Sequence, residues 1–391
     1  MKNLLIILIL MTGSSTFAQN SIEEVLNSVE QNNTTLKALK DNIEAQKLEN
    51  KTGIYLPNPE VEFNYLWGNP NNIGNRKDIS IRQTFDFPTI TGVKKKIADK
   101  QNHLLELQYK AERLDILLQT RLYVFDLIYY NALKKELEQR LEHAATLAAG
   151  YKNQLEKGEA NILEYNKAQL NLATVKGEIL SVETERKSIL AELKRLNGGI
   201  DVLISDSEYR DAVIPDNFDE WFAQAEQRNP VLEYVRQEIE LAKSQIALNK
   251  AATLPNFYAG FMREKVVGEA YQGISVGISI PLWENKNKVK QAKAALKATE
   301  TKQADSRLQF YEYLGNLYEK TKSLQATADE YKLSLSSLNN TALLKKALDA
   351  GEISLLDYIV EIGLYYNTVN LKLNAEREFQ KTFAELRRIE Y

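Results

Sequence analysis

The chain has 391 residues, with 50 Lys and Arg against 53 Asp and Glu, and a formal net charge of −3. This near balance does not favour nucleic-acid binding. The chain contains no cysteine, which excludes disulfides and thiolate metal sites.

The first predicted element is a secretory signal peptide at residues 1–18. Lys2 supplies a positive start, residues 4–11 form a short apolar run, and Thr16-Phe17-Ala18 resembles a cleavage site. The apolar run is too short to cross a bilayer as a helix. We therefore expect an exported chain that begins at Gln19, with no transmembrane helix in the rest of the sequence.

Proline positions divide the exported chain into short inserts and long helical regions. The first insert opens at Leu56-Pro57-Asn58 and closes at Phe87-Pro88, and the second opens with Leu-Pro-Asn at 254–256 and closes at Ile280-Pro281. Two long ranges contain none of the eight prolines: 89–214 and 282–391. Because proline breaks the interior of a helix, these ranges can form long helices and the inserts require another structure.

Apolar and polar residues alternate in both inserts, which predicts β-hairpins at 59–87 and 256–280. Each strand has about nine or ten residues, the length that a tilted strand needs to cross a bilayer. We expect Ile278 on a lipid-facing side at midplane depth. The polar residues that we expect to face a water-filled barrel lumen are Glu60, Glu62, Asn64, Arg82, Asp86, Ser275 and Ser279. Two soluble hairpins, each packed on a helix, are the alternative.

Four strands of this kind cannot form a membrane barrel alone. Unpaired strand edges are not tolerated in hydrocarbon, and the smallest known membrane barrels have about eight strands. If these strands span a membrane, several chains must share one barrel.

Apolar residues at spacings of three and four predict long helices around the hairpins. The predicted ranges are 34–53, 93–157 and 161–197 in the first half, and 230–252, 285–350 and 353–388 in the second. The helix at 93–157 would form a rod of roughly 100 Å. The heptad-like seams predict a coiled coil. A cytosolic scaffold would contain similar helices, but it would not carry the signal peptide and the hairpins.

The two halves repeat each other with a period of about 195 residues. Residues 30–33 match residues 226–229. A Gly-Glu pair occurs at 158–159 and again at 351–352, and it is followed by Leu-Glu-Tyr in the first half and by Leu-Asp-Tyr in the second. We therefore predict an internal two-fold repeat. The predicted divisions are a first repeat at 19–197, a linker at 198–217 and a second repeat at 218–391.

The sequence contains no pattern typical of an enzyme, and we expect neither catalytic residues nor a cofactor. The two histidines, His103 and His143, lie far apart and neither has a second ligand three or four residues away, so no metal site is predicted. No phosphate-binding loop or nucleophile motif occurs.

The signal peptide and the doubled helix–hairpin–helix unit resemble the TolC family of outer-membrane efflux channels, also called outer membrane factors. The most specific segments are 56–60 (LPNPE), 83–88 (QTFDFP) and 351–357 (GEISLLD). The first of these and the compact size resemble the heavy-metal, CzcC-like branch. The resemblance implies a homotrimer whose three chains form a twelve-stranded outer-membrane β-barrel and a long periplasmic α-helical coiled-coil barrel, with residues 198–217 as an equatorial linker.

The resemblance also implies two groups of functional residues at the periplasmic end. The helix turns would form the tip that contacts the adaptor protein, at Gly158, Glu159, Gly351 and Glu352. Acidic side chains after the turns would narrow the entrance of the tunnel, at Asp357, Glu361 and Glu164. The family's second acidic position falls on Val360 here, and Glu361 is its neighbour.

The leading functional hypothesis is a passive exit duct of a tripartite efflux system. It would be joined through a periplasmic adaptor to an inner-membrane pump, of the RND type, and would pass heavy-metal cations or drugs. An outer-membrane duct for type I protein secretion is an alternative with the same fold. A periplasmic coiled-coil structural protein without a pore is an alternative of another class.

Overall fold

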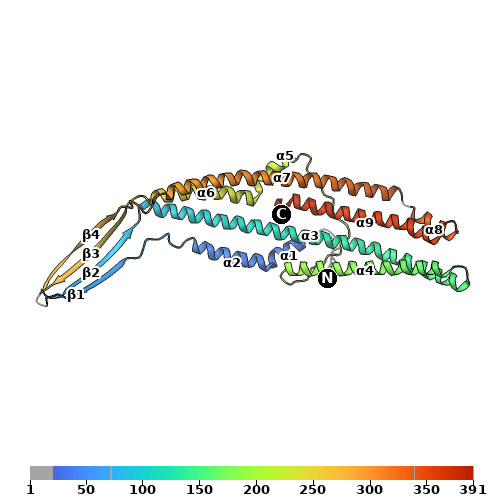
Figure 1. Ribbon diagram of the computed structural model, residues 1–391, viewed down its shortest axis with the longest axis horizontal. Helices are drawn as coiled ribbons and strands as arrows, with labels where there is room; N and C mark the ends of the chain where they lie inside the picture. Colours follow the sequence, from blue (N-terminus) through green and yellow to red (C-terminus); the bar gives the residue numbers. More distant parts are fainter. Residues whose placement is uncertain (1–20, 71–72, 339, 391) are drawn as a thin grey trace, which may run out of the picture.

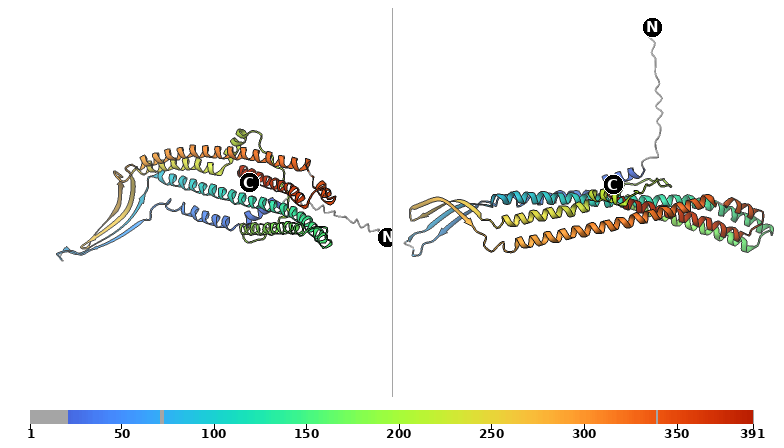
Figure 2. Two further views of the ribbon diagram at one scale, coloured as in Figure 1. Left: turned by 45° about the vertical axis from the view of Figure 1, so that its right-hand side comes forward. Right: turned by 90° about the horizontal axis from the view of Figure 1, so that it is seen from above.

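The computed structural model describes residues 21–70, 73–338 and 340–390. The predicted signal peptide lies outside this range. The described chain is long and bowed, with a β-sheet at one end and helices along the remaining length (Figures 1 and 2).

One antiparallel sheet contains all four described strands, in the order β1-β2-β3-β4. Their bounds are β1 Glu60–Leu66, β2 Arg76–Phe85, β3 Asn256–Val266 and β4 Glu269–Ser279. The hairpins are those that the alternating pattern predicts, and β2 pairs with β3 to join the two repeats. The outer edges of β1 and β4 have no partner strand among the described residues.

Four α-helices lie in the described part of the first repeat. They are α1 Ser21–Asn32, α2 Thr34–Glu49, α3 Pro88–Lys157 and α4 Ile162–Leu196. The long helix begins five residues before the predicted start at 93, because proline at the first helical position needs no hydrogen-bond acceptor for its nitrogen. α3 has 70 residues, so it is about 105 Å long.

The second repeat has the same order of helices with one difference. Its elements are α5 Phe218–Arg228, α6 Pro230–Ala251, α7 Lys288–Ser337, α8 Thr341–Asp349, α9 Leu355–Leu386 and a 3₁₀ turn, η2 Arg388–Glu390. The prediction of one continuous helix at 285–350 is wrong, since α7 ends at Ser337. Ser336 and Ser337 both donate hydrogen bonds to the carbonyl of Leu333, at 2.8 Å each, and such back-bonding by serine weakens a helix that already approaches two asparagines.

The helices form a curved layer, and the helices that make up this layer differ between its two halves (Figure 1). In the half next to the sheet, the contacts run from α7 to α6, α3 and α2. In the far half, they run from α7 to α9, α3 and α4. Only α3 and α7 extend through both halves. The layer therefore has two free edges, α7 on one side and α2 with α4 on the other.

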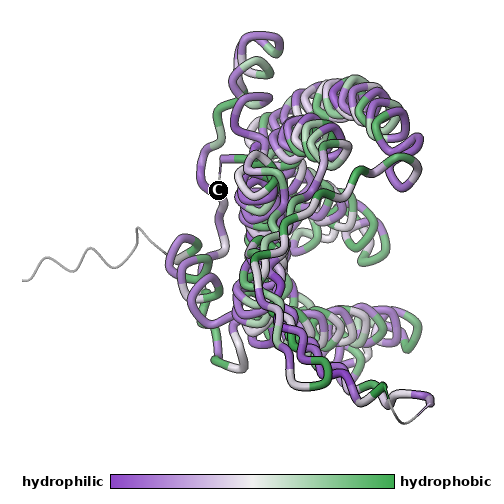
Figure 3. The backbone as a smooth tube through the Cα atoms, turned by 90° about the vertical axis from the view of Figure 1, so that its left-hand side faces the viewer, coloured by the Kyte–Doolittle hydropathy of each residue, from purple (hydrophilic) through white to green (hydrophobic). Residues whose placement is uncertain are grey.

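Two apolar clusters fix the middle of the layer, where α1, α5 and the linker lie. The larger cluster joins α1 to α3 and α4, and Leu193 at its centre is fully buried. Truncation of such a leucine to alanine costs about 2–5 kcal/mol. The smaller cluster packs α5 on α7 through aromatic side chains. These clusters hold α1 and α5 against the same side of the layer, the convex one (Figures 2 and 3).

An ion pair at this level is duplicated with the repeat. Arg113 of α3 makes two hydrogen bonds of 2.7 Å to Glu30 of α1. Arg307 of α7 makes the equivalent two bonds, of 2.6 and 3.1 Å, to Glu226 of α5. The hydrogen bonds from Arg113 lower the pKa of Glu30. Each pair fastens a short helix to a long one with the planar geometry that arginine and carboxylate share.

Candidate functional site: two sheet faces and the helix turns

The register of the sheet separates apolar from polar residues. A row through the middle of β2, β3 and β4 joins Ile81, Phe261 and Ile274 on one face, and Val61, near the start of β1, completes it. The row one residue away joins Glu60, Arg82, Gly260 and Ser275 on the other face. Paired residues in an antiparallel sheet point to the same side, so the alternation along each strand becomes two faces of different chemistry.

Six of the seven residues predicted to face a lumen lie in strands, and all six are on the polar face of the sheet. Glu60, Glu62, Asn64, Arg82, Ser275 and Ser279 have the same parity in the register. Asp86 lies just after β2 and forms an ion pair of 3.2 Å with Lys94 of α3. Ile278, expected at midplane depth, is one residue from the end of β4, whereas Ile274 is at the middle of that strand.

An aromatic ring is fitted into the polar face. The ring of Tyr258 lies beside Gly277, where an added Cβ atom would come within 2.2 Å of the ring. The guanidinium of Arg82 lies 5.0 Å from the centre of the same ring and 4.0 Å from a carboxylate oxygen of Glu60. Glycine at 277 therefore makes room for this stack of side chains.

The two helix turns at the far end have the same construction. Gly158 and Gly351 have φ angles of 77° and 71°, in the left-handed region that favours glycine. In both turns the glycine N–H and the following glutamate N–H donate to carbonyls of the preceding helix, at 2.8 to 3.1 Å. The N-cap of the next helix follows each glycine after three residues, at Asn161 and Ser354.

Two of the predicted aperture carboxylates complete capping boxes. Glu164 accepts a hydrogen bond of 3.1 Å from the N–H of Asn161, and Asp357 accepts one of 3.2 Å from the N–H of Ser354. The Ser354 hydroxyl donates to Asp357 at 2.6 Å and lowers the pKa of that carboxyl. Asp357 is exposed, and Glu164 is partly buried. Glu164 and Asp357, which the repeat predicts to be equivalent, thus have the same capping role in their helices.

Glu361 has different surroundings from Asp357. It lies over a groove between α9 and the interruption that separates α7 from α8, together with Leu338, Asn340 and Leu344. Its side chain is exposed and lies one helical turn beyond Asp357. The structure thus places three acidic side chains at or just after the turns, two of them as helix caps.

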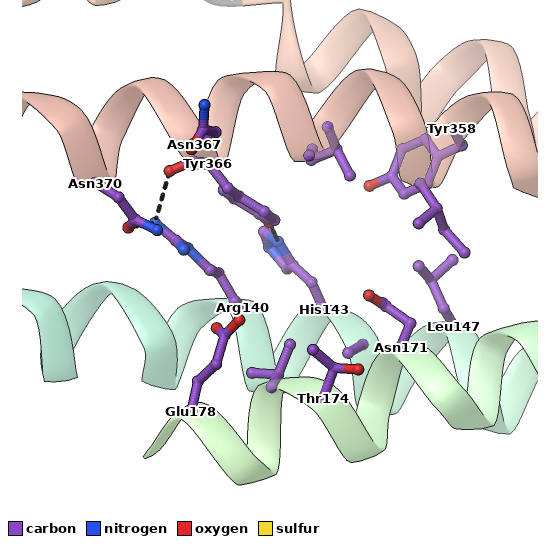
Figure 4. Close-up of a pocket in the computed structure, with 15 residues that line it drawn as sticks. Arg140, His143, Leu147, Asn171, Thr174, Glu178, Tyr358, Tyr366, Asn367 and Asn370 are labelled. Atoms are coloured by element: carbon purple, nitrogen blue, oxygen red, sulfur yellow. Dashed lines mark hydrogen bonds between the residues drawn. The ribbon is translucent and has the colours of Figure 1, made fainter. Parts of the chain in front are cut away.

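A polar cluster that the sequence does not predict joins the two helix pairs above the turns (Figure 4). It lies in a cleft of about 280 Å³ between α3, α4 and α9. The guanidinium of Arg140 donates to the Asn370 side chain at 2.9 Å and stacks 4.4 Å from the centre of the Tyr366 ring. The Tyr366 hydroxyl lies 3.0 Å from Nδ1 of His143.

Burial sets the protonation of this cluster. Arg140 is 5% exposed, and loss of hydration lowers the pKa of its guanidinium. Burial also raises the pKa of Tyr366 to about 12, so the phenol is neutral at physiological pH. The cluster therefore acts as a fixed polar contact between α3 and α9, and it contains no activated nucleophile.

The described residues were also compared with the requirements of a metal site and of a membrane-spanning helix. No group of three His, Cys, Asp or Glu side chains within the described ranges could hold a metal ion. His103 approaches only Glu106, at 3.6 Å, among the ion pairs of the described chain. None of the helices in the described ranges combines the length and hydropathy needed to cross a membrane.

Comparison with known proteins identifies the fold through structure rather than sequence. No family model matches the chain, and no curated protein sequence matches it. The Campylobacter jejuni outer membrane channel CmeC matches with a TM-score of 0.77 and 15% identity over 95% of this chain and 85% of CmeC.

Two further structures match over similar shares of the chain. CusC, described as forming a transmembrane channel, gives a TM-score of 0.77 and 15% identity over 95% of this chain and 92% of CusC. The open state of the Neisseria gonorrhoeae outer membrane channel MtrE gives 0.72 and 13% over 94% and 88% of the two chains. The predicted fold class, with long antiparallel helices and four strands per chain, is confirmed, and this chain has the fold of the TolC-like outer membrane channels.

Proposed function

We propose that the chain is a subunit of a trimeric outer-membrane exit duct, with its sheet in the membrane and its helices in the periplasm. The observation that carries this proposal is the sheet itself. It has an apolar face, a polar face and two unpaired edges. Such edges cannot remain open in hydrocarbon, and closure with other copies satisfies them.

The helical layer supports the same closure. Its free edges are α7 on one side and α2 with α4 on the other, and it curves in one direction (Figure 3). Three copies joined edge to edge would give twelve strands and a continuous helical wall. The convex side, which carries α1 and α5, would then face outward, and the polar face of the sheet would line the lumen.

The turns and their carboxylates would form the periplasmic end of this duct. Gly158, Glu159, Gly351 and Glu352 are the proposed contacts with a periplasmic adaptor protein. Asp357, Glu361 and Glu164 are the proposed aperture residues, because three-fold symmetry would turn each carboxylate into a ring of three. Acidic rings attract cations in channels.

The proposed system is a tripartite efflux complex with an inner-membrane pump of the RND type. The fold neighbours are bacterial outer membrane channels, which supports a conduit over an enzyme. Heavy-metal cations and drugs are the proposed cargo classes. A duct for type I protein secretion would have the same fold and is the second candidate. A coiled-coil protein without a pore leaves the apolar face of the sheet without a function.

Pore formation tests the proposal directly. The mature chain should require detergent for extraction from the outer membrane, run as a trimer in mild detergent and form conducting pores in planar bilayers. Crosslinks between α7 and α2 or α4 should join separate copies. Recovery of a soluble monomer from a periplasmic extract, without conductance after reconstitution, would exclude the duct.

A further inference from the structure

A row of lysines at the start of α7 lies beside the proposed membrane region. We propose that Lys290, Lys293 and Lys297, here called the lysine stripe, bind the anionic headgroups of phospholipids in the membrane leaflet that faces the helices. This inference rests on the proposed outer-membrane location. It adds a lipid-binding surface to the helical part of the molecule.

The segment that contains the stripe is strongly basic. Residues 281–299 contain five lysines and one glutamate, although the whole chain has a net charge of −3. All three stripe residues are exposed, and none of their ammonium groups forms an ion pair with another part of the chain that the structure describes. The three ammonium groups are therefore available to bind an anionic partner outside the described chain.

The heptad pattern of α7 shows which side of the layer the stripe faces. Its half-buried seam repeats every seven residues from Val289 to Phe310. Lys293 precedes Arg307 by two heptads, and Lys297 precedes Tyr311 by two. Arg307 and Tyr311 both bind acidic side chains of α5. The stripe thus shares a helix face with the residues that hold α5, on the convex side of the layer (Figure 3).

Apolar and aromatic side chains separate the stripe from the sheet. Leu282 and Trp283 lie three and four residues after the end of β4 and are 67% and 80% exposed. Exposed tryptophan at the end of a membrane strand is typical of the headgroup level. Lys297 is nine residues beyond the first residue of α7, about 14 Å along the helix. The stripe therefore extends from the headgroup level to between one and two Debye lengths (about 8 Å each at physiological salt) below it.

The first repeat has a similar feature on α3. Lys94, Lys95 and Lys96 follow the first hairpin, and Lys96 precedes Leu117 by three heptads. Leu117 packs in the cluster that holds α1 on the convex side. Basic residues thus follow both hairpins, and the heptad relation puts Lys96 on the same side of the layer as the stripe.

Helix electrostatics favour an anionic partner at this level. The first turns of α3 and α7, like those of α2 and α8, contain no acidic residue, whereas those of α1, α4, α5, α6 and α9 each contain at least one. Lysines near a helix N-terminus are unfavourable with the helix dipole. An anionic headgroup would offset both the lysine charges and the dipole, which makes phospholipid a better occupant than a neutral surface.

The experiment compares lipids on the assembled protein. The chain is purified in mild detergent, stripped of lipid, and titrated with phosphatidylglycerol or with phosphatidylcholine of the same acyl chains while thermal unfolding is followed. We expect phosphatidylglycerol to raise Tm at lower concentration than phosphatidylcholine, and added salt to reduce the difference. The triple variant Lys290→Gln, Lys293→Gln, Lys297→Gln should bind phosphatidylglycerol more weakly, by about fivefold for a lysine at the headgroup level and by less for Lys297, which lies further along the helix.

A matched control removes three exposed lysines of α4, which lies in the half of the layer far from the sheet. Lys167→Gln, Lys176→Gln, Lys187→Gln should leave the lipid preference unchanged. Equal response to both lipids, or a full phosphatidylglycerol response in the stripe variant, would overturn the proposal. A stripe variant that dissociates into single chains before lipid is added would assign the lysines to contact between copies. Failure of the wild type to need detergent would instead count against the proposed location.

Discussion

Replacement of Ile274 by arginine should disrupt the membrane sheet more than the same replacement at its neighbours. Ile274 is 83% exposed on the apolar face, in the row with Val61, Ile81 and Phe261. β4 has 11 residues, which at about 3.3 Å each and a tilt of about 40° span about 28 Å along the membrane normal. This matches the apolar band of a membrane barrel, about 25 Å tall, and puts Ile274 near its centre.

The expected cost of Ile274→Arg is therefore about 2–4 kcal/mol, the range for a lipid-facing arginine at the midplane. Ile278→Arg should cost about 0–1 kcal/mol, because Ile278 is on the same face but one residue from the end of β4. Ser275→Arg is next to Ile274 in sequence but on the polar face, and it should cost less than Ile274→Arg.

Reversible unfolding of the reconstituted protein in guanidinium measures these costs. Trp67 and Trp283, both 80% exposed and close to opposite ends of the sheet, provide the fluorescence signal. The expected order of cost is Ile274→Arg first, with Ile278→Arg and Ser275→Arg well below it. A larger loss from Ser275→Arg would mean that the two faces are assigned the wrong way round. Equal losses at 274 and 278 would remove the inferred depth.

Three further predictions concern the helical part. Gly351→Val should impair efflux and adaptor crosslinking while the trimer stays intact, because it forces a β-branched residue to a φ of 71°. Normal efflux in this variant would place the adaptor contact elsewhere. Asp357→Asn with Glu361→Gln should reduce cation selectivity in planar bilayers, whereas Ser354→Ala, which removes a cap but no charge, should keep the selectivity; the opposite pattern would leave Asp357 as a cap alone. Glu30→Gln should cost about 1 kcal/mol at neutral pH in chemical denaturation. Because the folded pKa of Glu30 is lowered, its contribution to stability is present above the unfolded pKa and is lost as pH falls through the folded pKa. The free energies of unfolding of the variant and the wild type should therefore converge in acid. A difference that stays constant with pH would contradict this.

Local patterns in the sequence were sufficient for most of the fold. Period-two alternation predicted both hairpins, and the positions of proline predicted which ranges can form long helices. Gly158 and Gly351 were predicted as turns, and both have the positive φ that such turns require. These signals succeed because each depends on residues close together in the chain.

The features that the sequence did not reveal depend on distant residues or on competing local preferences. β2 pairs with β3, more than 170 residues away, and the repeat alone did not indicate this. Arg140 and Asn370 are 230 residues apart, so no local pattern links them. The interruption after Ser337 was missed because the heptad pattern masks serine back-bonding. The capping role of Asp357 was missed because the same residue also matched a family position.

The change of partners halfway along the layer has a mechanical consequence. In the part of the chain that the structure describes, two of the four rows of helices are interrupted at one level, where α2 gives way to α4 and α6 to α9. Only α3 and α7 continue across this level. A beam that loses half of its continuous members at one cross-section bends most easily there. The ion pairs of Arg113 and Arg307 and the two apolar clusters act at this cross-section as a splint on its convex side. We therefore expect a displacement of the helix turns to bend the layer at this level and to leave the sheet in place. The strength of the ion pairs and apolar clusters would set how far the turns can move relative to the sheet.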